Sequence, residues 1–225
     1  MPLTEQSFTY REKPLNAQFE NHVLVLGAGG HAKVISEILE DSGMQIAGFV
    51  TLDGSDQLFC GHIVHSEDQL ASLFESGIQK IFPAIGDNQL RSNLANKVTA
   101  MGFTIVNALD PHSRISRSAK LGLGIAVMSG ACVNADSTIS DFAIVNTNAS
   151  IDHDCSIGTA THIAPGATLS GNVKVGSFTL IGTGSSVRDN MTIGSNTIVG
   201  VGSAVVCDIP NDVIAVGTPA RFSKK

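Results

Sequence analysis

The stretch ISDFAIVNTNASIDHDCSIGTATHI at residues 139–163 has an aliphatic residue at every sixth position, and this spacing continues on both sides of it. The aliphatic residues spaced by six are Ile115, Leu121, Val127, Val133, Ile139, Val145, Ile151, Ile157, Ile163, Leu169, Val175, Ile181, Val187, Ile193, Val199 and Val205. If isoleucine, leucine and valine fill roughly a quarter of all positions, chance would produce such an unbroken run about once in a billion trials. The period is therefore a property of the fold.

Small residues occupy most of the positions that lie two before each aliphatic residue. These positions hold Ala119, Ile125, Ala131, Ser137, Ala143, Ala149, Cys155, Thr161, Ala167, Val173, Thr179, Ser185, Met191, Thr197 and Ser203. A period of six fits no helical repeat, but it is a multiple of the two-residue period of a strand. Each unit is therefore predicted to be a short strand plus a corner, with both sets of residues facing one interior. This arrangement is a β-helix, which is stable only as a stack of coils.

Glycine directly follows several of the aliphatic positions. These glycines are Gly122, Gly158, Gly176, Gly182, Gly194 and Gly200. We expect them at corners where a side chain or a negative φ angle would be unfavourable.

The composition excludes several classes of protein. The chain has 225 residues, of which 43% are hydrophobic and 15% charged, so it is not a disordered chain. A net charge of −6, no tryptophan and one tyrosine disfavour nucleic acid as a partner. The sequence contains neither an apolar run of about 18 residues nor a signal peptide, so we expect no membrane contact and a cytoplasmic location. The four cysteines form no C-x-x-C pair, and we expect them to be reduced and not to bind zinc.

The chain is predicted to have three parts: a polar leader at residues 1–20, a small α/β domain at 21–108 and the repeat domain at 109–225. The elements expected in the α/β domain are strands at 22–26, 45–50, 80–84 and 104–107, a helix at 33–40 and a helix that ends near Met101. The first strand and helix are joined by GAGGHA at residues 27–32. Such a turn suits phosphate binding, because glycines let the backbone approach an anion and the helix N-terminus presents free N–H groups.

The repeat domain resembles that of the hexapeptide-repeat acyltransferases, and so does the ending VIAVGTPARF at 213–222. With GAGGHAKV at 27–34 ahead of it, the chain resembles the sialic acid O-acetyltransferases and nucleotide-amino-sugar N-acetyltransferases, which include the bacillosamine-pathway enzymes. The resemblance covers residues 21–222. It implies an α/β plus all-β fold, in which a small Rossmann-like domain that holds a nucleotide sugar precedes a left-handed parallel β-helix. It also implies a homotrimer with active sites between subunits.

The segment NTNASIDHDCSIG at 146–158 resembles the catalytic coil of this family. By that match His153 is the general base, a role that suits a pKa near neutrality, and Asp154 is its acidic partner. Neighbouring residues in an extended strand face apart, so their contact requires a corner at this point; without one, Asp152 is the competitor. Asn146 is expected to adopt a left-handed corner conformation.

The same match implies the ligand contacts. Residues matched to acetyl-CoA binding are His162, Thr183 and Val201, with Gly171 in the same groove, and residues matched to the sugar substrate are Gly29, Gly30 and His31. His162 could instead pack between protomers. Family enzymes that use UDP-sugars have two acidic residues at the end of the second strand, whereas this chain has Thr51 and Leu52, with Asp53 next. Either Asp53 takes their place in substrate binding through a shifted loop, or the base is held otherwise, or the base is a different one. Arg91 could contact phosphate or simply face solvent.

We therefore expect an acetyl-CoA-dependent N-acetyltransferase that acts on a nucleotide-linked amino sugar, with a UDP-4-amino-trideoxy sugar for surface glycan synthesis as the first choice. The reaction needs no metal. Three alternatives stay open: a sialic acid O-acetyltransferase, an N-acetyltransferase for a dTDP- or GDP-linked amino sugar, and a non-catalytic nucleotide-sugar-binding scaffold.

Overall fold

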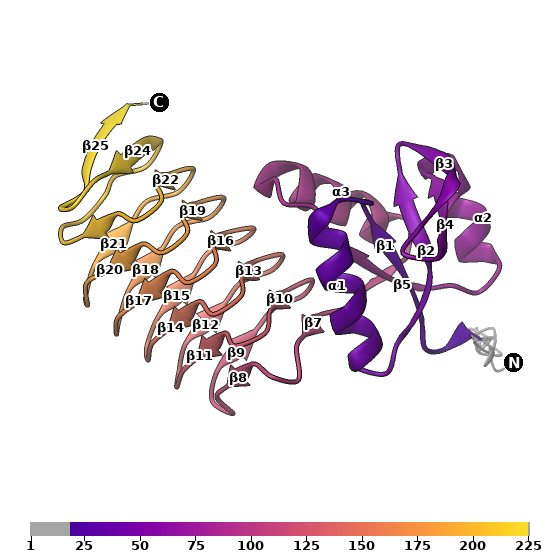
Figure 1. Ribbon diagram of the computed structural model, residues 1–225, viewed down its shortest axis with the longest axis horizontal. Coiled ribbons are helices and arrows are strands. Elements are labelled where there is room, and N and C mark those ends of the chain that lie inside the picture. The colour runs from indigo at the N-terminus through magenta and orange to yellow at the C-terminus, as the bar shows by residue number, and fades with distance from the viewer. Residues whose placement is uncertain (1–18, 225) are drawn as a thin grey trace, which may run out of the picture.

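The computed structural model describes residues 19–224 (Figure 1). Most of the polar leader expected at 1–20 lies outside the described residues. An α/β unit is followed by a long stack of coils, and the two are in contact. The fold expected from the sequence, a small Rossmann-like domain and then a left-handed parallel β-helix, is confirmed.

The α/β unit is built on a six-stranded sheet with the order β3-β4-β2-β1-β5-β6. Its strands are β1 (His22–Leu26), β2 (Gln45–Thr51), β3 (Asp53–Phe59), β4 (His62–Ser66), β5 (Lys80–Pro83) and β6 (Thr104–Ile105). Its helices are α1 (Gly30–Asp41), the 3-10 turn η2 (Glu67–Gln69), α2 (Leu70–Glu75) and α3 (Asn88–Ala100). The central strands are parallel, whereas β3 and β4 form an antiparallel hairpin at one edge. This hairpin and α2 were not among the predicted elements.

The β-helix has three sheets. The first contains β7 (Ala108–Leu109), β10 (Ala126–Val127), β13 (Ile144–Val145), β16 (His162–Ile163), β19 (Leu180–Ile181), β22 (Ile198–Val199), β24 (Val213–Val216) and β25 (Arg221–Lys224). The second contains β8 (Arg114–Ile115), β11 (Cys132–Val133), β14 (Ser150–Ile151), β17 (Thr168–Leu169), β20 (Ser186–Val187) and β23 (Ala204–Val205). The third contains β9 (Lys120–Leu121), β12 (Thr138–Ile139), β15 (Ser156–Ile157), β18 (Lys174–Val175) and β21 (Thr192–Ile193).

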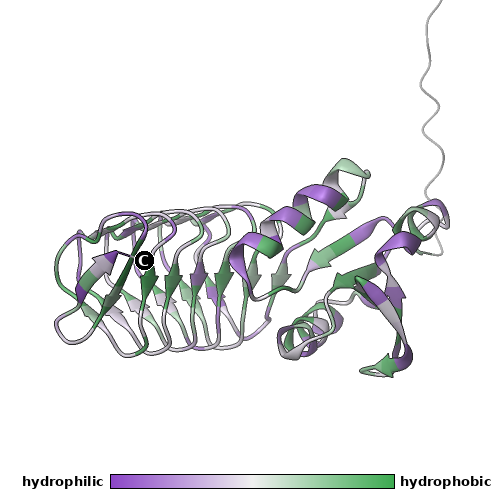
Figure 2. Cartoon of the chain, turned by 90° about the horizontal axis from the view of Figure 1, so that it is seen from above, coloured by the Kyte–Doolittle hydropathy of each residue, from purple (hydrophilic) through white to green (hydrophobic). Residues whose placement is uncertain are grey.

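Each two-residue strand from β7 to β23 pairs in parallel with the strand 18 residues away, as Ile151 does with Leu169. One coil therefore contains three hexapeptides. The aliphatic residues of the period point inward and form a continuous core, and the hydrophobic strand residues recur along the stack in Figure 2. Among the strands β7 to β25 of the β-helix, only the last, β25, runs antiparallel to its neighbour β24.

The interior also holds hydroxyl groups at the small positions. Thr161, Thr179 and Ser185 are fully buried, and each donates a 2.7 Å hydrogen bond to a carbonyl of a neighbouring turn: Gly176, Gly194 and Gly200. A buried hydroxyl is tolerated when it is hydrogen-bonded, so these positions accept serine and threonine as well as alanine.

Two reasons were expected for the corner glycines, a lack of room for a side chain and a positive φ angle. The first is correct and the second is wrong. Gly158 and Gly176 do not have positive φ angles. A Cβ on Gly158 would instead lie 2.5 Å from the backbone nitrogen of Ser177 in the next coil. The left-handed corner residues lie three before the aliphatic positions: Asp136, Phe142, Asn148, Asp154, Ala160, Asn172, Phe178, Asn190 and Asn196. The left-handed conformation expected at Asn146 is therefore wrong, because it belongs to Asn148.

Two apolar clusters join the α/β unit to the β-helix. The helix α1 packs through Ala32 and Ile35 against the first sheet, in one buried cluster with Ala126. The other face of the small sheet forms a second cluster that includes the corner residues Phe142 and Ala160. The glycine turn before α1 and the start of α3 are thereby held next to the first sheet of the β-helix.

Candidate active site

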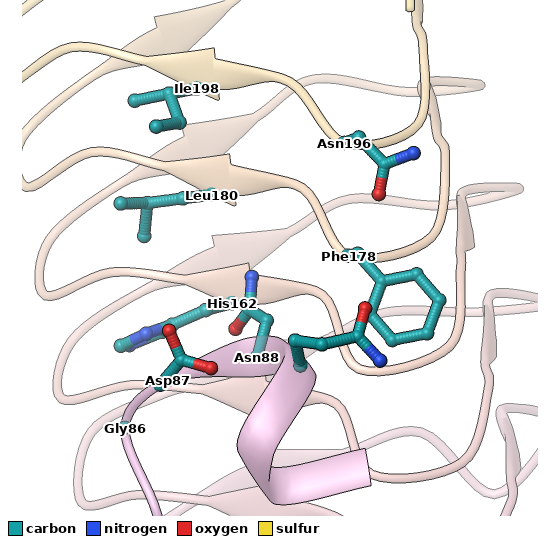
Figure 3. A pocket seen from close by; sticks show the side chains of 9 residues that line it. Gly86, Asp87, Asn88, His162, Phe178, Leu180, Asn196 and Ile198 are labelled. Carbon is teal, nitrogen blue, oxygen red and sulfur yellow. The ribbon is translucent and has the colours of Figure 1, made fainter. Parts of the chain in front are cut away.

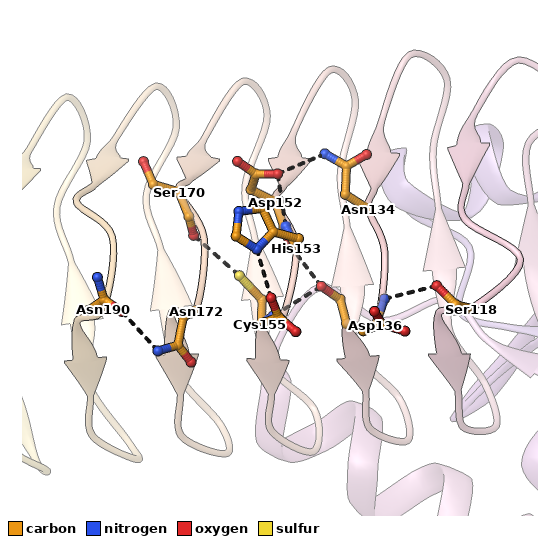
Figure 4. Close-up of polar contacts among 11 residues, drawn as sticks. Ser118, Asn134, Asp136, Asp152, His153, Cys155, Ser170, Asn172 and Asn190 are labelled. Carbon is orange, nitrogen blue, oxygen red and sulfur yellow. Dashed lines mark hydrogen bonds and ion pairs between the residues drawn. The ribbon is translucent and has the colours of Figure 1, made fainter.

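His153 lies at the corner between the second and third sheets, just after β14 (Figure 4), and Asp154 is the next residue along the chain. Asp154 has a φ of 61°, and this left-handed turn brings the two neighbouring side chains to the same side. His153 Nδ1 lies 2.8 Å from Asp154 Oδ2. The corner that this contact requires is therefore present, and Asp154, not Asp152, meets the imidazole.

Asp152 has a different role at this corner. Its Oδ1 accepts hydrogen bonds from the backbone nitrogen of His153 at 2.8 Å and from Asn134 Nδ2 at 3.2 Å. Beneath it, the buried Ser137 hydroxyl donates to the carbonyl of Asp152 at 2.7 Å and accepts from the backbone nitrogen of Cys155 at 3.0 Å. The backbone on both sides of His153 is thus fixed by groups of the preceding coil.

The carboxylates around His153 raise its pKa above the usual 6.5, first through the hydrogen bond to Asp154 and then through the charge of Asp152. An imidazole that donates Nδ1–H to a carboxylate has Nε2 free to accept a proton. The His153 side chain is 59% exposed, so Nε2 is accessible from outside the chain. This arrangement can perform general-base chemistry.

Gly171 lies directly beside this imidazole. A Cβ on Gly171 would be 2.6 Å from His153 Cε1 and 2.7 Å from Nε2. The sequence match had suggested a place in the acetyl-CoA groove for this glycine. Its immediate structural role is to leave room for the imidazole of His153.

His162 lies far from this corner, on the first sheet. It borders a cavity of about 310 Å³ together with Leu180 and Ile198, and the start of α3, with Gly86 and Asn88, forms the opposite wall (Figure 3). The cavity therefore lies between the α/β unit and the β-helix.

Asn146 sets the tautomer of His162. Asn146 Oδ1 accepts from the backbone nitrogen of Thr147, so its Nδ2 donates to His162 Nε2, 3.0 Å away. Nδ1 of a neutral His162 then carries the proton. Burial, and after it the charges of Arg91 and His31, lower the pKa of His162 to about 4.

His31 is the second residue of α1, and it is close enough to His162 for its charge to act on that residue. Burial and then the charge of Arg91 lower the pKa of His31 to about 4. The buried Nε2 of His31 has no hydrogen-bond partner among residues 19–224. A Cβ placed on Gly29 or on Gly30 would have no other part of the protein within 4 Å of it. The turn can therefore receive a ligand close to its backbone.

The remaining predicted site residues lie on two other parts of the surface. Thr183 and Val201 occupy equivalent positions on successive coils, at the corner between the first and second sheets, and Val201 is 78% exposed. Asp53 begins β3 and lines a separate cavity of about 580 Å³ with Asp56 and His65. A single chain therefore does not bring His153 together with His162, His31 or Asp53.

Between residues 19 and 224, no cluster of three or more His, Cys, Asp or Glu side chains could hold a metal ion. The helices found there are all too short or too polar to cross a membrane. All four cysteines are free thiols.

Several known proteins resemble this chain. The family described as the PglD N-terminal domain matches residues 22–98. The structure of PerB from Caulobacter crescentus, in complex with CoA and GDP-perosamine, is 43% identical, with a TM-score of 0.87 over 91% of this chain and 98% of that one. The chain belongs to the hexapeptide-repeat nucleotide-amino-sugar N-acetyltransferases.

The sequence resemblance to this N-acetyltransferase family is thereby confirmed. The acetyltransferase domain of PglB from Neisseria gonorrhoeae, in complex with acetyl coenzyme A, is 38% identical, with a TM-score of 0.82 over 89% of this chain and 98% of that one. WeeI from Acinetobacter baumannii is 25% identical, with a TM-score of 0.84 over 89% and 99%. An uncharacterized protein of Acanthamoeba polyphaga mimivirus is 34% identical over 124 residues, and the chain spans about a quarter of that protein's length, 24%.

In this N-acetyltransferase, both interpretations of Arg91 made from the sequence are wrong. Arg91 neither faces solvent nor is free to contact phosphate, because it is 0% exposed and its N–H groups are already hydrogen-bonded within the protein. The sequence alone carried no signal for this burial, because the groups that accept its hydrogen bonds on the β-helix are backbone carbonyls.

Proposed function

We propose that the protein transfers the acetyl group of acetyl-CoA to the amino group of a nucleotide-linked amino sugar. The observation that carries this proposal is the pair of His153 and Asp154, which leaves an exposed imidazole nitrogen with raised basicity. Family membership supports the reaction class, because CoA and GDP-perosamine are bound in the PerB structure and acetyl-CoA in that of PglB.

In the proposed reaction, the amine nitrogen attacks the thioester carbonyl carbon while His153 Nε2 takes up the proton that the amine loses. The new C–N bond forms, the C–S bond breaks, and CoA leaves as the thiolate, which the imidazolium can protonate. Asp154 stabilises the imidazolium through the hydrogen bond to Nδ1. Backbone N–H groups that point at the carbonyl oxygen would stabilise the oxyanion.

The groove for acetyl-CoA is proposed to run along the first sheet, from His162 past Leu180 and Ile198 to the edge with Thr183 and Val201. The first three side chains border one cavity, and apolar side chains suit a pantetheine chain. Neutral His162, which carries its proton on Nδ1, can donate a hydrogen bond to an acyl oxygen. Val201 can contribute only its backbone polar groups.

The nucleotide sugar is proposed to bind at the start of α1. The glycine turn with Gly29, Gly30 and His31 offers an open backbone and a helix N-terminus, which favour a diphosphate. Asp53 lies after β2, where the nucleobase is expected. Uracil, the base of UDP, is expected from the sequence resemblance, while the GDP-perosamine in a relative of 43% identity supports guanine. A carboxylate such as Asp53 suits guanine, whose N1 and N2 both donate hydrogen bonds.

The separation of the two histidines supports a homotrimer with active sites between subunits. His153 lies at the corner opposite the first sheet, so a sugar held near His162 cannot reach the base of its own chain. We propose that a neighbouring subunit supplies His153 to each site, as the family resemblance implies.

A panel of acceptors tests the function. CoA release is measured with GDP-, UDP- and dTDP-linked 4-amino sugars and with free and CMP-linked sialic acid. We expect acetylation of a nucleotide amino sugar, and His153→Ala is expected to lower kcat by about 10²- to 10⁴-fold. The control is His112→Ala, because His112 is 81% exposed beside Asp110 outside the site. Acetylation of sialic acid alone would favour the O-acetyltransferase, and the absence of acetyl-CoA binding would favour the scaffold.

A further inference from the structure

Arg91, in the second turn of α3, is 0% exposed. All five N–H groups of its guanidinium donate hydrogen bonds of 2.7–3.1 Å. Their acceptors are the carbonyls of Phe142, Ile85, Gly86 and Ala160 and the side chain of Asn88. Within the described residues no carboxylate forms an ion pair with it. Burial lowers its pKa to about 10, so it is still charged at neutral pH.

The acceptors belong to both halves of the molecule. Ile85, Gly86 and Asn88 form the loop that starts α3, while Phe142 and Ala160 are left-handed corner residues of successive coils. Asn88 extends the connection to a third coil, because its Nδ2 donates to the carbonyl of Thr179 at 3.3 Å. One side chain therefore fastens the start of α3 to the edge of the β-helix.

This fastened segment is one wall of the cavity that His162 borders. Gly86 and Asn88 line the cavity and contact Arg91, whereas Arg91 itself does not line it. The distance between this wall and the first sheet thus depends on a residue that touches no ligand.

The geometry points to Arg91 as a positioning residue of the reaction. It holds the loop of residues 85–88 at a fixed distance from His162, and so aligns the α/β unit, where the nucleotide sugar is proposed to bind, with the first sheet of the β-helix, where acetyl-CoA is proposed to bind. This inference rests on the proposed function. A planar guanidinium with five donors can satisfy acceptors in two units at once, whereas an ammonium has three donors and no fixed plane.

Arg91→Lys tests the inference, because it keeps the charge and loses the fork of donors. We expect kcat to fall by about 10- to 100-fold, since small misplacements of reacting groups have effects of that size, while KM for both substrates changes less than about threefold. Hydrogen exchange of residues 85–90, measured on the free protein, is expected to accelerate. The matched control is Ser42→Ala: the Ser42 hydroxyl donates to the carbonyl of Ile38 at 2.8 Å and also lies 3.3 Å from the carbonyl of Leu109, so it is another polar group at the contact between the two units.

The outcomes separate cleanly. A kcat within twofold of wild type, or unchanged exchange at residues 85–90, would overturn the positioning role. So would an equal loss of kcat in the Ser42→Ala protein. If the wild-type protein acetylates no sugar of the panel, the proposed function fails, and the exchange experiment alone then decides whether Arg91 holds the loop. If Arg91→Lys does not fold, Asn88→Ala removes one acceptor of the guanidinium, and the same loss of kcat with faster exchange is expected.

Discussion

The imidazole of His153 lies against Gly171 so closely that a Cβ on the glycine would come within 2.6 Å of Cε1. Gly171 does not have a positive φ, so its backbone alone would accept any residue. The reason for glycine at this position is therefore the ring of the general base on the preceding coil.

Gly171→Ala is expected to displace this ring and lower kcat by about 10- to 100-fold, because the base leaves its productive position. The free energy of unfolding should change by less than about 1 kcal/mol, since an exposed ring can move aside. Steady-state kinetics and urea unfolding measure the two effects. The adjacent Ser170→Ala adds no atom near the imidazole and is the control, and equal kinetics for the two variants would contradict this role of Gly171.

Asp154→Asn should move the acid limb of the pH profile to lower pH. The carboxylate raises the pKa of His153, so the protonated, inactive imidazole persists to higher pH in the wild-type protein. Without that charge the base is freed at lower pH, but it is weaker, and the plateau of kcat/KM should fall about tenfold or more. Rates between about pH 5 and pH 9 give both values. Asp110→Asn, beside the exposed His112, is the control, and an unshifted acid limb in the Asp154 variant would count against the pairing.

The buried histidines His31 and His162 should make the protein sensitive to acid. Their folded pKa values of about 4 lie below the unfolded value of 6.5. The unfolded state therefore binds more protons between pH 6.5 and 4, and the free energy of unfolding falls as the pH drops through that range, by about 1–3 kcal/mol for each histidine. His162→Gln should lose less stability over this range than wild type. His112→Gln should behave like wild type, and a parallel decline in all three proteins would refute the assignment.

Gly176→Ala should destabilise the stack without touching the site. Its Cβ would lie 2.4 Å from the backbone nitrogen of Ser195, which belongs to the next coil and cannot move alone. We expect a loss of about 3 kcal/mol in the free energy of unfolding. Gly166→Ala is the comparison, because Gly166 has a φ of +65° and open space around it, and only about 1 kcal/mol is expected there. Urea unfolding measures both losses. Equal losses of unfolding free energy in the two variants would contradict the idea that the close approach of the next coil requires glycine at position 176.

The β-helix could be predicted from the sequence because its repeat is local. Each aliphatic residue, from Ile115 to Val205, repeats a contact with the residue 18 positions away, so periodicity alone reveals the fold. The His153–Asp154 contact could be anticipated for a similar reason, since it needs only a corner. The hairpin of β3 and β4 was missed because its exposed residues show little alternation between apolar and polar positions.

The junction between the two units could not be predicted. The burial of Arg91 depends on carbonyls of Phe142 and Ala160, which lie 51 and 69 residues away and leave no trace in the side-chain pattern. The bond of Asn146 to His162 was missed for a related reason: Asn146 was assigned to a turn, and only the stacking of successive coils brings the two side chains together.

The reversal of direction at the end of the first sheet has a consequence for assembly. A stack of parallel strands would otherwise end in an open edge onto which the coils of another molecule could add. The strand β25 instead crosses this edge in the opposite direction and carries Arg221 and Lys224. A further parallel coil added to the first sheet would not match the direction of β25 and would meet two basic side chains, so this end of the sheet disfavours end-to-end stacking of β-helices.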